Sequence, residues 1–187
     1  MVRLGDIAEI VRGVTFKPDQ VTNADDPEGV VCLRTKNVQS TLDISDLIYT
    51  PERAVKNAAQ WVRPGDIVIS SANSWNLVGK CSWVGTLDFQ AAIGGFIVLM
   101  RTNSSEIHAR YLYRWFSSHR VPPLVRSFGQ KMTSISNLNL SRTLALEIPL
   151  PPLPELADSI FIDMFEWAKY RLGRRCFWSL LQSCKVA

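Results

Sequence analysis

The chain has 187 residues, of which 47% are hydrophobic, 20% are charged and 10% are aromatic, and its formal net charge is +4. This composition excludes a disordered chain, because it supplies enough apolar surface for a core, and the length suits one domain of about 150 residues with an appendage. No apolar run approaches the ~20 residues of a membrane-spanning helix. The N-terminus carries no apolar signal segment, so we expect a cytoplasmic protein.

The charges are unevenly distributed along the chain. Residues 53–142 carry 11 Lys and Arg against 3 Asp and Glu, whereas residues 1–52 carry 5 against 9. Residues 143–168 carry 5 acidic groups and no basic one, and residues 169–187 carry 5 basic groups and no acidic one. A basic middle between acidic flanks suits a nucleic-acid-binding face, but a solvated surface of arginines gives the same pattern. The pattern therefore permits DNA binding without requiring it.

The residue types that usually catalyse reactions or bind metals form no motif in this sequence. The 4 cysteines lack a Cys-x-x-Cys spacing and are accompanied by only 2 histidines. This favours free thiols, with a disulfide or a metal site as the alternative. Neither a nucleophile elbow nor a phosphate-binding glycine loop is present. We therefore expect no catalytic residue, no metal and no cofactor in this chain.

The first third of the chain is predicted to begin with a short helix. Apolar residues recur at helical spacing in residues 4–12, and Gly13 is predicted to end this helix in a left-handed conformation. A strand is predicted at residues 30–34, where it runs into a polar cluster. The stretch TPERAVKNAA predicts a second helix, with Thr50 as its N-cap and Pro51 in its first turn.

Short apolar runs predict three further strands, at residues 67–70, 81–84 and 96–100. The Pro-Gly-Asp sequence predicts a tight turn before the first of them, and Gly94 and Gly95 interrupt the apolar stretch before the last. Helices are predicted at residues 106–117, capped by Ser104 or Ser105, and at residues 121–128.

The segment from Gly129 to Glu155 changes character three times. A polar loop to Ser136 precedes residues 138–150, whose apolar pattern predicts a strand or a packed extended segment. Four prolines between residues 149 and 154 then prevent a helix or a central strand from continuing. We predict an α+β domain over residues 1–150, with a mixed sheet and packed helices. A proline-rich elbow and a projecting spacer helix at about residues 155–172 are expected to follow within residues 151–187.

Five segments occur in an informative order: LGDIAEIVRGVTFK, CLRTKNV, RPGDIVISSANSWNLVGKCSWVG, AAIGGFIVLM followed by ARYLYRWFSS, and IPLPPLPE. Together they resemble the target-recognition domain of the specificity subunit of type I restriction–modification enzymes. The resemblance covers most of residues 1–165. It departs from the family where the usual Leu-Pro-Glu-Gln helix start is Leu-Pro-Glu-Leu here.

The resemblance implies a non-catalytic subunit that reads one half of a bipartite site in double-stranded DNA. It also implies docking to modification subunits, which carry S-adenosylmethionine, and assembly with a motor–nuclease subunit. Family members usually hold two recognition domains and this sequence holds one, so it is a half-size subunit, a fragment or a protein that pairs with a second copy. The tail, residues 173–187, leaves the helical pattern, and either a native end or a truncated or shifted reading frame accounts for it.

Base readout requires amides, hydroxyls and basic groups on loops, and phosphate binding requires Lys and Arg. Without the resemblance, each such loop residue is more simply a solvated one. With it, the predicted DNA-binding residues are Thr15, Lys17, Arg34, Lys36, Asn37, Asn73, Trp75, Asn76, Lys80, Arg126, Gln130, Lys131, Thr133 and Ser134. Asparagines and glutamine suit adenine edges, basic residues suit phosphate or guanine, and Trp75 suits stacking or wedging.

An apolar seam on the helix after the prolines is predicted to bind a partner or a second copy; it consists of Leu156, Ile160, Met164 and Trp167. A core helix of the same domain is the plain alternative. Two copies paired about a two-fold axis would read an inverted repeat. The alternative function is a truncated half-subunit that acts mainly in assembly and reads little DNA.

Overall fold

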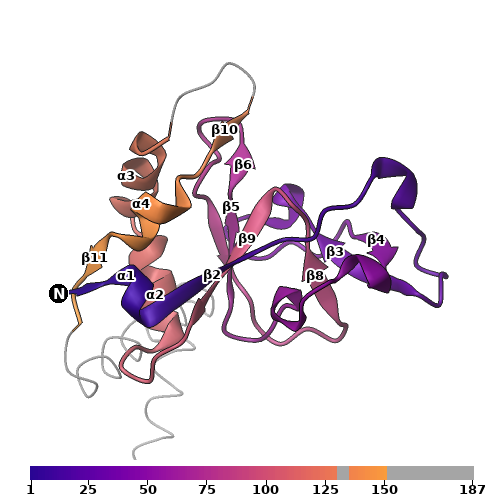
Figure 1. The fold of residues 1–187 in the computed structure, drawn as a ribbon, viewed down its shortest axis with the longest axis horizontal. Coiled ribbons are helices and arrows are strands. Elements are labelled where there is room, and N and C mark those ends of the chain that lie inside the picture. Colours follow the sequence, from indigo (N-terminus) through magenta and orange to yellow (C-terminus); the bar gives the residue numbers. More distant parts are fainter. Residues whose placement is uncertain (130–134, 151–187) are drawn as a thin grey trace, which may run out of the picture. The chain divides into compact units, whose positions relative to one another are not determined.

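A four-stranded antiparallel sheet lies at the centre of the fold (Figure 1). The computed structural model of the chain describes residues 1–129 and 135–150. The strand order is β2-β9-β5-β7, with β2 at Ala8–Arg12, β9 at Ile97–Thr102, β5 at Ile67–Ser70 and β7 at Cys81–Trp83. The proline-rich elbow, the predicted spacer helix and the tail lie outside the described residues.

A three-stranded mixed sheet packs on one face of the central sheet. Its middle strand, β3 (Gly29–Leu33), pairs antiparallel with β4 (Ile48–Pro51) and parallel with β8 (Ala91–Ile93). Two short antiparallel pairs complete the strands: β1 (Val2–Arg3) with β11 (Glu147–Ile148), and β6 (Ala72–Asn73) with β10 (Ser136–Asn137). The predicted α+β class with a mixed sheet is confirmed.

Helices cover the opposite face of the central sheet (Figure 1). They are α1 (Leu4–Ile7), α2 (Ala109–Phe116), α3 (Val121–Ser127) and α4 (Leu140–Leu144). Short 3-10 turns occur in the connections at Pro18–Gln20, Thr35–Asn37, Glu52–Ala54 and Ala58–Gln60. Within the described residues, no helix has the length and apolar character needed to cross a membrane.

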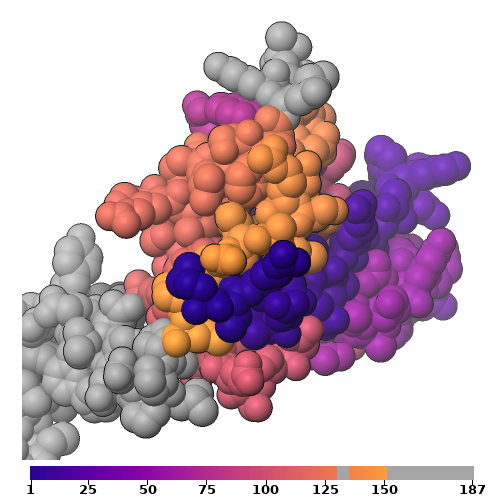
Figure 2. Space-filling view, turned by 60° about the vertical axis from the view of Figure 1, so that its left-hand side comes forward, coloured from indigo at the N-terminus to yellow at the C-terminus, as the bar shows by residue number. Residues whose placement is uncertain are grey.

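The central sheet is buried on both faces, which explains the continuous apolar runs in its two middle strands, β5 and β9. Ile67 and Ile69 of β5 pack with the helices, whereas Val68 between them packs with the three-stranded sheet. All four residues of β5 are buried. The N-terminal residues lie against segment 135–150 (Figure 2), where Val2 pairs with Ile148.

The predicted helix at residues 4–12 is wrong in its second half. Only Leu4–Ile7 is helical, and Ala8–Arg12 is strand β2, because pairing with β9 supplies the hydrogen bonds that a helix would otherwise provide. Gly13 is not a left-handed cap, since positive φ among the described residues occurs only at Gly65 and Gly79. Gly13 is needed for close approach: a Cβ there would lie 2.1 Å from the Gly94 carbonyl oxygen.

The predicted helix from Thr50 is also wrong. Thr50 is buried in β4 and pairs with Val30, so non-local strand pairing overrides the local capping signal.

Residues 138–150 contain a helix where a strand or an extended segment was predicted. This helix is α4, and the Asn139 side chain accepts a hydrogen bond from the Arg142 amide at 3.0 Å at its start. Helix α2 begins after His108, whose Nδ1 accepts from the Arg110 amide at 3.2 Å, later than predicted.

The turn before β5 forms as predicted and is fixed by a buried ion pair. Gly65 has φ of +93°, and the Arg63 amide donates to the Asp66 carboxylate at 2.8 Å. Two bonds of 2.7 Å join the Arg101 guanidinium to that carboxylate. Arg101 also donates to the carbonyls of Ala59 and Trp61. The side-chain exposures are 12% for Arg101 and 2% for Asp66, so this pair connects β9, the turn and the preceding loop.

Candidate nucleic-acid interface

Two predicted cations, Lys80 and Arg126, line one groove of about 520 Å³. The groove is formed by the loop after β3, the segment between β5 and β7, and helices α2 and α3. Its lining is Gln39, Ser40, Asn76, Val78, Lys80, Cys81, Tyr113, Ser117, Pro122 and Arg126. Predicted loops that are far apart in sequence therefore meet here, and none of these described lining residues is acidic.

A glycine seats the Ser71–Lys80 segment against helix α3. Gly79 has φ of +80°, and a Cβ at this position would lie 2.9 Å from Cγ2 of Val125. The Gly79 amide donates to the Ser70 carbonyl at 2.9 Å. This turn returns the chain from the groove to β7, and it places Lys80 directly before that strand.

The two cations in the groove are held by polar contacts to neighbouring segments. Arg126 donates to the Asn76 carbonyl at 3.1 Å and to the Pro122 carbonyl at 3.0 Å. Lys80 donates to the side-chain oxygen of Gln39, and Gln39 donates to the Lys36 carbonyl at 2.8 Å. These bonds limit the freedom of long side chains before any ligand binds, which lowers the entropic cost of binding.

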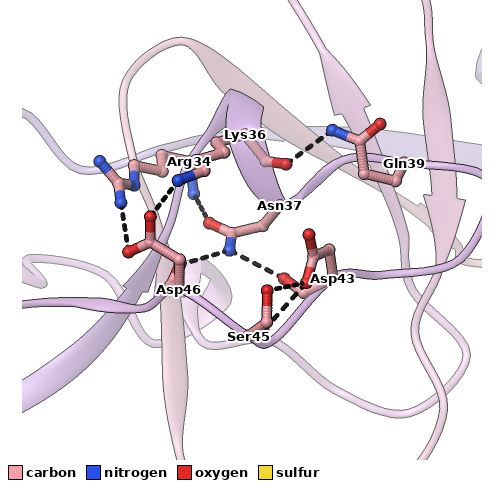
Figure 3. Close-up of polar contacts among 7 residues, drawn as sticks. All are labelled: Arg34, Lys36, Asn37, Gln39, Asp43, Ser45 and Asp46. Atoms are coloured by element: carbon pink, nitrogen blue, oxygen red, sulfur yellow. Dashed lines mark hydrogen bonds and ion pairs between the residues drawn. The ribbon is translucent and has the colours of Figure 1, made fainter.

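The loop after β3 contains a second polar cluster (Figure 3). Asp46 accepts from Arg34 at 2.8 Å and also from Lys36. The hydrogen bond from Lys36 is the main reason that the pKa of Asp46 lies below its ordinary value. Arg34 and Lys36 therefore share the Asp46 carboxylate, which partly neutralises their charge.

Asn37 differs from the other predicted residues of this loop, because only 1% of it is exposed. Its amide nitrogen donates to the carbonyls of Asp43 and Asp46, at 2.8 and 2.9 Å. Its side-chain oxygen accepts from the Arg34 amide at 2.8 Å. These three bonds occupy the side chain in holding the loop together, so Asn37 is buried where an exposed base-reading amide was predicted.

A second concave surface, of about 480 Å³, contains another predicted residue, Thr15. The other described residues that line it are Arg12, Gly13, Ser71, Ala72, Gly95, Phe96, Val98, Asn137, Leu138, Leu140 and Ser141. They come from the end of β2 and the residues after it, the segment after β5, the start of β9 and the turn before it, and the segment that contains β10 and the start of α4. The Ser71–Lys80 segment contributes to both concave surfaces, which makes it the structural link between them.

The remaining predicted residues lie outside both lining sets or outside the described residues. Lys17 is exposed, Trp75 is half-buried, and the Asn73 amide donates to the Ser70 hydroxyl at 3.2 Å. Gln130, Lys131, Thr133 and Ser134 are not among the described residues, nor are the predicted partner-binding residues Leu156, Ile160, Met164 and Trp167.

The groove carries two basic side chains and several uncharged polar ones, and its other titratable groups are a thiol and a phenol. Burial raises the pKa of the Cys81 thiol to about 12, so this thiol is neutral near pH 7. Burial likewise raises the pKa of Tyr113. Among the described residues, no group of three or more His, Cys, Asp or Glu is placed to hold a metal ion. The surface offers hydrogen bonds and positive charge to a ligand.

Comparison with known sequences relates this chain to one protein family. Residues 1–164 match the family model described as "Type I restriction modification DNA specificity domain". The chain is 28% identical over 155 residues to the type I restriction enzyme EcoKI specificity subunit of Escherichia coli K12, which covers 80% of this chain and 32% of that protein. It is 27% identical over 163 residues to the StySPI specificity subunit of Salmonella potsdam, covering 83% and 33%. The chain thus spans about a third of the length of these relatives.

Solved structures share the fold. The HsdS subunit from Thermoanaerobacter tengcongensis superposes with a TM-score of 0.64 at 19% identity, over 92% of this chain and 38% of that one. The type I restriction–modification S subunit from M. genitalium gives a TM-score of 0.59 at 13% identity, over 92% and 40%. At these identities the superpositions establish the fold alone.

Proposed function

The chain belongs to the family of type I restriction modification DNA specificity domains, and we propose that it reads one half of a bipartite sequence in double-stranded DNA. The observation that carries this proposal is the match of residues 1–164, most of the chain, to the family model. The basic groove supports it, because the groove combines cations with amide and hydroxyl groups from the segments after β3 and β5 and from helices α2 and α3.

In this proposal, Lys80 and Arg126 bind backbone phosphates and the neighbouring polar groups read bases. Asn76 is exposed, lines the groove and suits an adenine edge. Gln39, which the sequence analysis missed, lies between Lys36 and Lys80 through its two side-chain bonds. It fixes the direction of the Lys80 ammonium, and its own groove-lining position allows it to contact a base edge.

The partners are proposed from the family match. Relatives named as specificity subunits are about three times as long as this chain, and in this proposal the described domain supplies one reading unit and a second recognition domain supplies the other. We place the protein in the cytoplasm as a non-catalytic subunit that docks modification subunits, with the motor–nuclease subunit completing the enzyme. The residues proposed to make the pairing contact are Leu156, Ile160, Met164 and Trp167.

A selection from randomised duplexes tests the reading function. The full chain, alone and with modification subunits, selects duplexes from a random library, and fluorescence anisotropy compares the selected duplex with a scrambled one. We expect a sequence preference that depends on this chain. Lys80→Ala and Arg126→Ala should weaken binding to both duplexes and should each reduce the slope of log K against log [salt] by about 1.

Lys56→Ala is the matched control, since Lys56 is an exposed lysine outside the groove lining, and it should leave the slope unchanged. If the library yields no preferred sequence with or without modification subunits, the reading function is refuted. Assembly with modification subunits in that case would favour an assembly protein that reads little DNA.

A further inference from the structure

Phe96 is an exposed aromatic residue at the turn between β8 and β9, where the sequence pattern predicted the start of a core strand. It is 61% exposed, whereas Ile93 before it and Ile97 after it are fully buried. Single exposed apolar side chains are common on protein surfaces and need no explanation. The support beneath Phe96 and the residues around it are what distinguish this position.

The backbone of Phe96 is fixed by contacts to distant segments. Its carbonyl accepts hydrogen bonds from the amides of Ser71 and Ala72, at 3.0 and 3.1 Å. The turn is closed by the Ile97 amide, which donates to the Gly94 carbonyl at 3.0 Å. Gly94 in turn lies so close to Gly13 that a Cβ on Gly13 would overlap its carbonyl. The turn that carries the Phe96 ring is therefore held in place by the Ser71–Ala72 segment and by Gly13. Such a fixed backbone suits a side chain that contacts a ligand in one position.

The concave surface around Phe96 has the chemistry of a nucleic-acid contact. Its described lining includes the hydroxyls of Thr15, Ser71 and Ser141, the amide of Asn137 and the guanidinium-bearing Arg12. None of these lining residues is acidic, and Arg12 is exposed. An aromatic ring beside hydroxyl, amide and cationic groups matches the combination that binds bases by stacking or wedging and phosphates by hydrogen bonds. Of the large apolar residues in this lining, Val98 and Leu138 are buried, whereas Phe96 is largely exposed.

We propose that Phe96 contacts a base directly, by stacking on it or by wedging into a base step, and that Arg12 and Thr15 bind the adjacent backbone. This inference rests on the proposed reading of duplex DNA and adds a second contact surface to the groove of Lys80 and Arg126. The Ser71–Lys80 segment joins the two, because Ser71 and Ala72 support the Phe96 turn while Asn76 and Lys80 line the groove.

The test compares Phe96→Ala and Phe96→Trp with the wild-type full chain on the selected duplex. Val21→Ala is the control, because Val21 is 44% exposed and lies outside both lining sets. Affinity is measured by anisotropy, and base unstacking is measured by 2-aminopurine placed at successive positions of the site. Removing one base–aromatic stack should weaken binding about 5- to 150-fold, and Phe96→Trp should retain most of the affinity.

We expect the wild type to raise 2-aminopurine fluorescence at one step, Phe96→Ala to abolish that rise and Val21→Ala to retain it. Unchanged affinity and fluorescence in Phe96→Ala would overturn the inference while leaving the proposed function intact, provided that Lys80→Ala still weakens binding. Loss of modification-subunit binding with unchanged DNA affinity would also overturn it and would make Phe96 a protein contact. Failure of the proposed function is a separate result, visible as the absence of any preferred duplex for the wild type.

Discussion

Replacing Arg101 with Met should destabilise the domain strongly, because it removes one partner of the buried ion pair with Asp66. The carboxylate would keep the Arg63 amide, at 2.8 Å, as its remaining hydrogen-bond donor among the described residues. The carbonyls of Ala59 and Trp61 would lose the donors that Arg101 now supplies at 3.2 and 3.0 Å. Hydrogen bonding to Asp66 raises the pKa of Arg101, so the wild-type guanidinium stays charged throughout the accessible pH range.

The expected loss is about 3–5 kcal/mol, the usual effect of leaving a buried charge without its partner. This is a large share of the roughly 5–15 kcal/mol that stabilises a typical domain. For a domain of this length, each kcal/mol lowers Tm by about 2–4 °C, so Arg101→Met should melt on the order of 10 °C below the wild type. Most of this penalty comes from the 2% exposure of the Asp66 side chain, because water cannot replace the lost donors.

Urea unfolding followed by tryptophan fluorescence measures this difference. The matched control is Arg53→Met, which breaks the ion pair between Arg53 and Glu28, whose side chains are 74% and 72% exposed. Exposed pairs contribute roughly 0–1 kcal/mol, so the control should unfold close to the wild type. A loss below about 1 kcal/mol for Arg101→Met, or one equal to that of the control, would refute the argument.

Three further predictions concern close packing, thiol burial and loop charge. Gly13→Ala should lower Tm by several degrees in a thermal melt, because its Cβ would lie 2.1 Å from the Gly94 carbonyl oxygen; an unchanged Tm would show that the two turns separate easily. Cys32 and Cys81, whose pKa values burial raises to about 12, should resist a thiol reagent at pH 8 until urea is added, and rapid labelling of either in the folded protein, located by peptide mapping, would contradict this. Asp46→Asn should strengthen duplex binding and steepen its salt dependence, since two cations lose their shared carboxylate; weaker binding would instead mean that Asp46 positions those cations.

The two strands that are covered on both sides, β5 and β9, were predictable from sequence. Residues 67–69 and 97–100 are continuously apolar because helices cover one side and the three-stranded sheet covers the other. The turn before β5 was predictable because proline, glycine and aspartate all favour turn conformations. Gly65 in this turn does adopt a positive φ. In both places, local sequence and tertiary environment favour the same structure.

The errors occur where pairing with a distant strand overrides a local signal. Ala8–Arg12 has helical spacing but pairs with β9, and Thr50 resembles an N-cap but pairs with β3. Gly13 was interpreted as a cap, although its role is the close approach to Gly94. None of these three partners is near in sequence, so local spacing alone does not reveal the contacts.

The candidate site was predicted in part, by residue type but not by arrangement. The sequence indicated Lys80 and Arg126 as loop cations, but their common groove depends on the packing of Gly79 against Val125. Gln39 belongs to no recognisable sequence motif, and its hydrogen bond from Lys80, which indicates its place in the groove, is visible only in the structure. The Gly-Gly sequence directly before Phe96 was the available signal that this ring leaves the core, because such a pair permits a tight turn.

The arrangement of the central sheet and its loops separates the residues that stabilise the fold from the residues proposed to read DNA. The sheet is packed on both faces, so substitutions within its strands affect stability before they affect binding. The proposed reading residues instead lie beyond the strand ends: Asn76 in the segment after β5, Gln39 in the loop after β3, and Phe96 in the turn before β9. Such positions tolerate substitution with little loss of stability. Specificity should therefore change with a few loop residues, whereas Gly13, Gly79 and the buried ion pair have to be retained to keep those loops in place.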